Sequence, residues 1–174
     1  MRRVSLLYGS IIGALLCVNI VYTVYLCYYR PDFEGNMLLG YALMLLEFSL
    51  VYFGIRSYRQ KELRGHISWP RAFNVGFLIV MVAGSIYVVV WLFYYYLFVP
   101  DFIDKYIAHV LQATAKQGAS LKELADKKLE LLDFQQKYKN PLFVILATYA
   151  EVLPTGTLVA LISALLLKKG NPNT

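Results

Sequence analysis

The chain has 174 residues, of which 59% are hydrophobic and only 16% are charged. This length suits one domain, and such an apolar composition excludes an ordinary soluble globular protein. The formal net charge of +6 would suit a nucleic-acid partner in a soluble protein. Here the basic residues cluster beside long apolar stretches, so we expect a lipid bilayer as the surroundings and no nucleic-acid partner.

Four apolar stretches, at about residues 4–29, 37–55, 73–99 and 142–167, are each long enough to cross a bilayer. A spanning helix needs about 20 apolar residues, because every backbone group in lipid must be bonded within the helix. The first stretch is too long for a cleaved signal peptide and ends in no cleavage motif. The sequence predicts an all-α polytopic membrane protein, with four transmembrane helices in a single membrane domain over residues 1–174.

Basic residues predict the orientation of these spans. They gather before the first span, between the second and third, and after the fourth: Arg2, Arg3, Arg56, Arg59, Lys61, Arg64, Arg71, Lys168 and Lys169. The loop after the first span offers Arg30 against Asp32 and Glu34. By the positive-inside rule, both termini are expected to be cytoplasmic. The seven lysines of segment 100–141 oppose this orientation, but most lie far from the span ends, where the rule is weaker.

Aromatic residues gather where the first and third spans end. They are Tyr22, Tyr25, Tyr28 and Tyr29 in the first span, and Trp91, Tyr94, Tyr95, Tyr96 and Phe98 in the third. Tyr and Trp favour the membrane interface, where the ring lies in hydrocarbon and the polar tip stays hydrated. An interfacial belt is therefore the favoured interpretation, and a sugar-binding or aromatic-cage role is the alternative.

Small residues repeat every four positions in two of the spans, and this spacing lets helix backbones approach closely. The two stripes are Ser5, Gly9 and Gly13 in the first span, and Gly156, Ala160 and Ala164 in the fourth. Both stripes lie near the cytoplasmic face. We therefore expect the first and fourth spans to touch along them, the alternative being that one stripe faces a second copy of the protein.

Segment 100–141 is expected to form an extracytoplasmic helical hairpin. Its first arm, 101–116, carries apolar residues along one side, and Gly118 marks its end. Ser120 and Glu123 form a capping-box pattern at the start of the second arm. This arm places Leu121, Leu124, Leu131, Leu132 and Tyr138 on one side. The apolar sides are expected to pack on each other, the alternative being that they await a partner.

Two carboxylates inside the predicted spans carry the sharpest functional signal. Glu47 lies in the middle of the second span and Glu151 lies in the fourth. An acidic residue at mid-bilayer costs about 2–3 kcal/mol, so it normally faces the bundle interior, bonds a partner or takes a proton. Asn19 and Tyr87 are the polar residues expected to reach these acids.

The distances of the two acids from the span ends predict that they are staggered in depth. A stagger suits a two-step proton or cation path better than a metal site. The simpler interpretation is structural, with both acids protonated, bonded to neighbouring helices and fixing the bundle. A contact with a partner is the third possibility.

The sequence offers few signals for a disulfide, a metal site or a catalytic site. Cys17 and Cys27 lie on one helix, too far apart to bond each other, and neither His66 nor His109 has a second metal ligand at a useful spacing. No Ser/His/Asp set, phosphate-binding loop or glycine-rich fingerprint is present. We therefore expect no enzyme activity, no catalytic residues, no cofactor and no metal.

Several short motifs occur together and in order along nearly the whole chain. They are Gly54–Arg59, Trp69–Phe73, Pro100–Phe102, Tyr138–Phe143 and Glu151–Gly156. In this combination the chain resembles domain-of-unknown-function family 4199, four-span membrane proteins found mainly in Bacteroidota. The resemblance implies a bacterial inner (cytoplasmic) membrane location and the same four-span plan. It implies no activity and no functional residues.

Three classes of function remain open. The favoured hypothesis is a non-catalytic membrane component, an accessory subunit or scaffold that binds a membrane-protein partner or a second copy of itself. The alternative is a small oligomeric proton- or cation-coupled transporter or channel that uses Glu47 and Glu151. An intramembrane enzyme acting on lipid ranks last, because no His, Asp or Cys constellation lies at the membrane surface.

Overall fold

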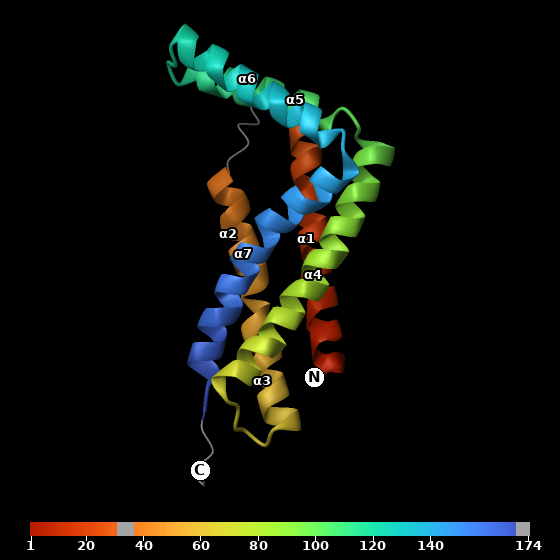
Figure 1. Cartoon of the computed structure of the whole chain (residues 1–174), viewed down its shortest axis with the longest axis vertical. Coiled ribbons are helices and arrows are strands. Elements are labelled where there is room, and N and C mark those ends of the chain that lie inside the picture. Colours follow the sequence, from red (N-terminus) through yellow and green to blue (C-terminus); the bar gives the residue numbers. More distant parts are fainter. Residues whose placement is uncertain (31–36, 170–174) are drawn as a thin grey trace.

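The computed structural model describes residues 1–30 and 37–169, and its regular elements are helices (Figure 1). The elements are α1 (Arg2–Tyr29), α2 (Met37–Phe48), α3 (Leu50–Glu62), α4 (Trp69–Phe98), α5 (Phe102–Lys116), α6 (Leu121–Tyr138) and α7 (Pro141–Leu167). In the described part, four helical stretches are long and apolar enough to cross a membrane: Arg2–Tyr29, Leu39–Glu62, Trp69–Phe98 and Pro141–Leu167. The predicted all-α, four-span fold is confirmed. The acidic loop with Asp32 and Glu34 lies outside the described residues.

The second span differs from its predicted bounds, because its helix continues beyond residue 55 to Glu62 and is divided at Ser49. The extension carries Arg59 and Lys61 in its last turn, where positive charge stabilises the end of a helix. At the division, the Ser49 hydroxyl donates to the Leu46 carbonyl oxygen at 2.6 Å. Such a side-chain bond competes with the backbone ladder of the helix.

Helix α4 is the centre of the bundle, and α1 and α7 make their main contacts with it. A Cβ added to Gly9 of α1 would lie 2.6 Å from the Val82 Cβ. A Cβ added to Gly156 of α7 would lie 2.5 Å from the Val80 Cγ1. The prediction that the first and fourth spans touch along their small residues is therefore wrong. Both stripes instead receive the β-branched side chains of α4, which lies between them.

The rest of the first stripe follows the same pattern. Ser5 is buried in the bundle, and a Cβ added to Gly13 would lie 3.0 Å from the Ile86 Cβ. In the second stripe, Ala160 and Ala164 are fully buried. The Ala160 Cβ lies 3.0 Å from the position that a Cβ would take at Gly76 of α4.

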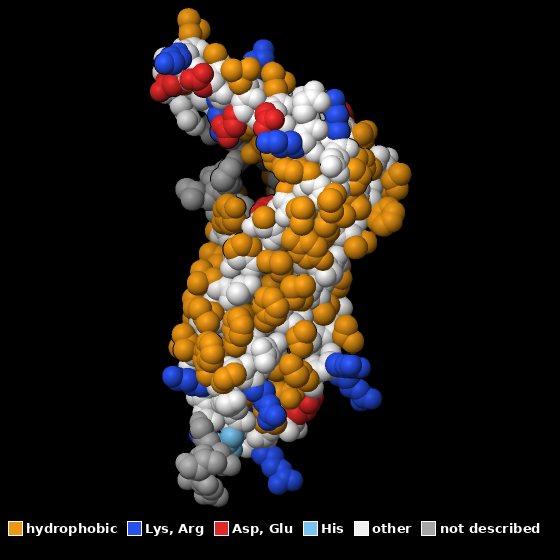
Figure 2. All heavy atoms as spheres, in the orientation of Figure 1, with side chains coloured by type: hydrophobic (Ala, Val, Ile, Leu, Met, Phe, Trp, Pro, Cys, Tyr) orange, Lys and Arg blue, Asp and Glu red, His pale blue; other side chains and the backbone are white. Residues whose placement is uncertain are grey.

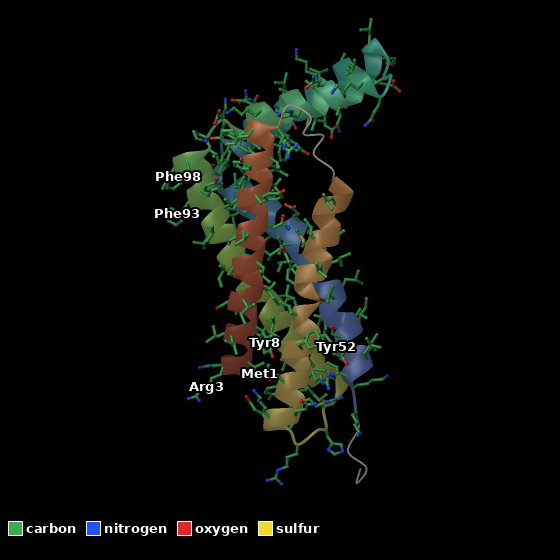
Figure 3. The ribbon with its side chains drawn as sticks, turned by 180° about the vertical axis from the view of Figure 1, so that it is seen from behind. Met1, Arg3, Tyr8, Tyr52, Phe93 and Phe98 are labelled. Atoms are coloured by element: carbon green, nitrogen blue, oxygen red, sulfur yellow. The ribbon has the colours of Figure 1, made fainter. Side chains whose placement is uncertain are left out.

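The outer surface of the bundle is apolar, as a lipid-facing surface requires. Figure 2 shows hydrophobic side chains over the length of the helices, with lysines and arginines gathered beyond their lower ends. Phe93 and Phe98 project away from α4 near its C-terminal end (Figure 3) and are 62% and 72% exposed. Their exposure is typical of interfacial aromatic residues.

The start of α1 and the end of α7 lie at the same end of the bundle (Figure 1). Ile67, in the loop before α4, and Lys169, after α7, exchange two backbone hydrogen bonds of 3.0 and 2.9 Å. The Arg59 guanidinium donates to the Leu167 carbonyl oxygen at 3.0 Å. These contacts tie α3, α4 and α7 together at this end, which we call the basic end.

Helices α5 and α6 lie side by side across the opposite end of the bundle (Figure 1). The turn between them contains Gly118 at φ +83°, a backbone conformation that favours glycine. The predicted capping box starts α6, because the Glu123 N–H donates to the Ser120 hydroxyl at 3.3 Å and the Ser120 N–H donates to the Glu123 carboxylate at 2.8 Å. Between the arms, Ile107 and Leu131 are buried.

Candidate functional site

The end of α6 is fixed to α4 through Tyr138. The Trp91 indole N–H donates to the Tyr138 hydroxyl at 3.1 Å, and the Tyr96 hydroxyl donates to the Tyr138 carbonyl oxygen at 3.2 Å. The Tyr138 ring also contacts Tyr95 and Phe134, with ring centroids 5.2 and 4.9 Å apart. Burial, reinforced by the negative charge of Glu151, raises the pKa of Tyr138 to about 12. Tyr138 therefore attaches α6 to α4 through its hydroxyl, its carbonyl oxygen and its ring.

The start of α5 is fixed to α1 through polar contacts. The Tyr28 hydroxyl donates to the Asp101 carboxylate, and the Lys105 ammonium lies 3.0 Å from the same carboxylate. The Lys105 nitrogen also lies 3.4 Å from the centroid of the Tyr28 ring, a cation–π contact. One turn further along α5, His109 Nε2 lies 3.0 Å from the Cys27 carbonyl oxygen. We call these contacts, centred on Asp101, the α5 clasp.

The α5 clasp is expected to loosen at low pH. The hydrogen bond from Tyr28, followed by that from Lys105, holds the pKa of Asp101 below its usual value. A carboxylate with a lowered folded-state pKa contributes stability above its unfolded pKa, about 3.9, and loses it as the pH falls through the folded value. The protection of α5 amides against hydrogen exchange, measured relative to the intrinsic rate at each pH, should therefore fall on acidification below about pH 4. In Asp101→Asn the exchange should be fast already at neutral pH, and an unchanged acid response in this variant would contradict the assignment.

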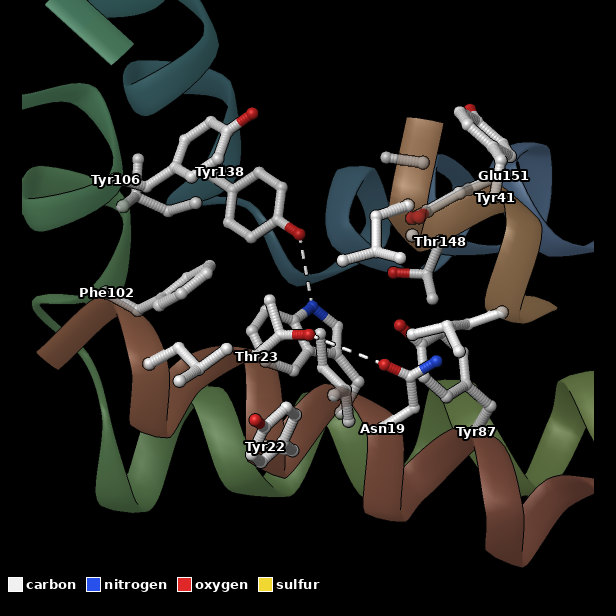
Figure 4. Close-up of a pocket in the computed structure, with 18 of the residues that line it drawn as sticks. Asn19, Tyr22, Thr23, Tyr41, Tyr87, Phe102, Tyr106, Tyr138, Thr148 and Glu151 are labelled. Carbon is white, nitrogen blue, oxygen red and sulfur yellow. Dashed lines mark hydrogen bonds between the residues drawn. The ribbon is translucent and has the colours of Figure 1, made fainter. Parts of the chain in front are cut away.

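A cavity of about 840 Å³ lies between the bundle and the crossing helices α5 and α6 (Figure 4). Its wall includes three of the four intramembrane polar candidates, namely Asn19 from α1, Tyr87 from α4 and Glu151 from α7. Glu151 and Thr148 enter the cavity from α7 and face Tyr87 and Asn19 (Figure 4). The structure thus brings together three polar residues from three different spans.

Glu47, the fourth candidate, lies behind this wall. The Asn19 amide donates to Glu47 Oε1 at 3.2 Å, and the Thr23 hydroxyl lies 3.5 Å from the Asn19 oxygen. Glu47 Oε2 is buried and has no hydrogen-bond partner among the described residues. Asn19 therefore links the cavity to Glu47, while the two acids themselves occupy separate places.

Three further residues line the cavity although the sequence did not identify them as site residues. Trp91 and Tyr138 line the cavity and are joined by a hydrogen bond. The sequence predicted Trp91 to be an interfacial residue and Tyr138 to lie on the apolar side of a helix. Thr148 is buried and donates to the Val144 carbonyl oxygen at 2.7 Å. Its spacing of three residues from Glu151 was the only available signal, because it places both on one helix face.

The chemistry of the cavity wall suits binding. One carboxylate, one amide, the Arg30 guanidinium and several hydroxyls meet an otherwise apolar surface, as in many sites for small molecules. Over residues 1–30 and 37–169, no group of three or more His, Cys, Asp and Glu side chains could hold a metal ion.

A family model described as protein of unknown function (DUF4199) matches residues 7–169, nearly the whole chain. The chain therefore belongs to this family, and the resemblance seen in its motifs is confirmed. No curated protein and no solved structure matches the chain. The family match assigns no activity to the chain.

Proposed function

We propose that the protein is a non-catalytic membrane component, an accessory subunit or scaffold, whose α6 arm binds a partner protein. The observation that carries this proposal is a row of exposed leucines on α6. Leu121, Leu129 and Leu132 are 88%, 67% and 40% exposed. At 3.6 residues per turn they lie within an arc of about 80°. We call this row the leucine face.

The mounting of α6 supports this role. Tyr138 and the α5 clasp fix the bases of the two arms to the bundle, while the far ends of the arms extend past α2 (Figure 1). A rigidly mounted arm presents its surface at little entropic cost to a partner.

The charges of α6 indicate what kind of partner fits. The Lys127 ammonium lies 2.8 Å from the Glu130 carboxylate, and the Lys137 ammonium lies 2.5 Å from the Asp133 carboxylate. These ion pairs lie on the side of α6 away from the leucine face, which is bordered by the exposed Lys122 and Lys128. The expected partner is an apolar helix or sheet surface on the extramembrane part of another membrane protein, with Lys122 and Lys128 at the polar rim.

Site-specific photocrosslinking in native membranes tests the proposal. A photoreactive residue in place of Leu129 should give one discrete protein adduct. The same residue in place of Asp126, which is exposed on a different side of α6, is the matched control and should give little of it. Equal labelling from both positions, or adducts with lipid alone, would contradict a partner-binding leucine face.

The alternative function is an oligomeric proton- or cation-coupled transporter or channel that uses Glu47 and Glu151. The link from the cavity through Asn19 to Glu47 favours it. However, Ile12, Phe48 and Ile79 are fully buried in the core toward the basic end, so a path within one chain would have to cross close packing. Loss of ion flux through the reconstituted protein in Glu47→Gln and Glu151→Gln would support the transporter hypothesis. If wild type shows no flux and the two variants still form the Leu129 adduct, the scaffold hypothesis is supported.

We also propose a bacterial inner-membrane location with both termini in the cytoplasm. The support is the set of Lys and Arg residues that border the spans at the basic end, namely Arg2, Arg3, Arg56, Arg59, Lys61, Arg64, Arg71, Lys168 and Lys169. A reporter enzyme that is active only outside the cytoplasm should work when inserted after Gly118 and fail when fused to the C-terminus. The reverse pattern would overturn this orientation.

A further inference from the structure

The cavity beneath α5 and α6 has a wall rich in aromatic rings. Eight aromatic residues line it, among them Tyr87, Trp91, Phe102, Tyr106, Phe134 and Tyr138. The face of such a ring attracts a cation that lies within about 6 Å of the ring centroid. The volume of about 840 Å³ lies in the range of sites that enclose small organic molecules. The wall therefore offers a surface that suits either a neutral apolar molecule or an organic cation.

The charged groups of the cavity distinguish these two kinds of ligand. Glu151 and Arg30 are the charged side chains among its described lining residues. Arg30 follows the last residue of α1, eleven residues beyond Asn19, which is about 16 Å along the helix axis. Glu151 enters at the level of Asn19 and Tyr87 (Figure 4). The inner part of the cavity is therefore negative, and the positive charge lies toward its mouth.

The Glu151 carboxylate is available to a ligand. The side chain is exposed in the cavity, and within the described part of the chain no hydrogen bond or ion pair engages its carboxylate. The Thr155 hydroxyl lies 3.4 Å from the main-chain oxygen of Glu151, not from its side chain. Glu47, in contrast, accepts a hydrogen bond from Asn19. A carboxylate in such surroundings favours a positive partner, because an isolated charge among apolar groups is costly.

We propose that this cavity binds an organic cation, an amine or quaternary ammonium group carried on an apolar body. Glu151 is the counter-ion, and the aromatic wall surrounds the charged group and its apolar substituents. Charge complementarity at the inner end selects the cation over a neutral molecule of the same shape. This site is separate from the leucine face, so the proposal does not depend on whether α6 binds a partner.

Equilibrium binding of radiolabelled benzyltrimethylammonium to the full-length protein in lipid nanodiscs tests this proposal, with empty nanodiscs as the blank. We expect saturable binding at one site per chain. The neutral carbon isostere, neopentylbenzene, has the same shape and should compete at least tenfold more weakly than the unlabelled cation. Equal competition by the two molecules would reveal a generic apolar cavity and overturn the proposal, as would the absence of saturable binding. This comparison requires no variant, so it does not depend on whether a variant folds.

Binding to variants of the protein identifies which carboxylate is the counter-ion of the cation. Glu151→Gln keeps the shape of the side chain and should weaken binding of the cation at least tenfold, with little effect on neopentylbenzene. Glu47→Gln is the matched control, because it neutralises the other intramembrane acid and keeps an oxygen that accepts from Asn19; it should bind within twofold of wild type. Tyr106→Leu should weaken binding severalfold while Tyr106→Phe retains it, as a cation–π contact requires. Unchanged binding in Glu151→Gln would contradict the assignment of the counter-ion.

Discussion

Replacing Gly9 with leucine is expected to separate α1 from α4 and to destabilise the whole bundle. Even the first added carbon would lie 2.6 Å from the Val82 Cβ and 3.0 Å from the Ile79 carbonyl oxygen. Neither atom is the end of a flexible side chain, so α1 as a whole would have to move. Overpacking of this kind costs about 1–3 kcal/mol, and we expect a leucine to reach the upper end of that range.

Thermal unfolding of the purified protein in detergent measures this effect, and the chain offers a matched control. A Cβ added to Gly84 of α4 would meet no atom closer than 3.6 Å. Gly84→Ala should therefore match wild type or gain about 0.5–1 kcal/mol from the better helix former. Gly9→Ala should fall between Gly9→Leu and wild type. Similar unfolding temperatures for Gly9→Leu and Gly84→Ala would contradict the close approach of α1 and α4.

Replacing Tyr138 with alanine is expected to release α6 from the bundle. Tyr138 is 7% exposed, and its ring and hydroxyl join α6 to Trp91 and Tyr95 of α4. Truncating a buried aromatic residue costs about 3–5 kcal/mol. Because the loss is concentrated at the base of the arm, we expect hydrogen exchange in α6 to accelerate far more than exchange in α4.

Two comparisons separate the contributions of Tyr138. Tyr138→Phe keeps the ring and removes the acceptor of the Trp91 N–H, so it should cost only about 1–3 kcal/mol. Leu132→Ala truncates a neighbouring residue on the exposed leucine face and should leave exchange in α6 close to wild type. If Tyr138→Ala were as mild as Leu132→Ala, the attachment of α6 would depend on other contacts.

The spans could be predicted from the sequence because their signal is local. An apolar run of sufficient length has few alternatives to a membrane helix, and the chain folds accordingly. The end of the second span was less predictable. Arg59 and Lys61 break the apolar run but are good helix formers at a helix end, so the helix continues to Glu62.

The partners of the small-residue stripes could not be predicted, because spacing identifies a face and not what covers it. Gly9 and Gly156 both lie on faces that permit close approach. Their depth alone suggested that they meet each other. The side chains that fill their grooves come from α4, and this choice depends on the order of helices around the bundle, which no local pattern encodes.

The candidate site was predictable only as a set of polar residues. Asn19 and Glu47 stand out because polar groups inside a span are costly, and the structure joins them at 3.2 Å. The cavity itself arises from α5 and α6 crossing the bundle end, a tertiary feature. Trp91 and Phe102 therefore became lining residues without any distinguishing sequence signal beyond their aromatic character.

Capture of the tagged protein from native membranes tests most directly the claim that the protein is an accessory component. We expect wild type to co-purify with one membrane protein at a fixed stoichiometry. Leu121→Ser, Leu129→Ser and Leu132→Ser combined should lose this partner, whereas combined serine replacement of Asp126, Glu130 and Lys137, which are exposed on a different side of α6, should retain it. Recovery of wild type alone as a defined oligomer, or retention of the same partner by the leucine variant, would contradict the account.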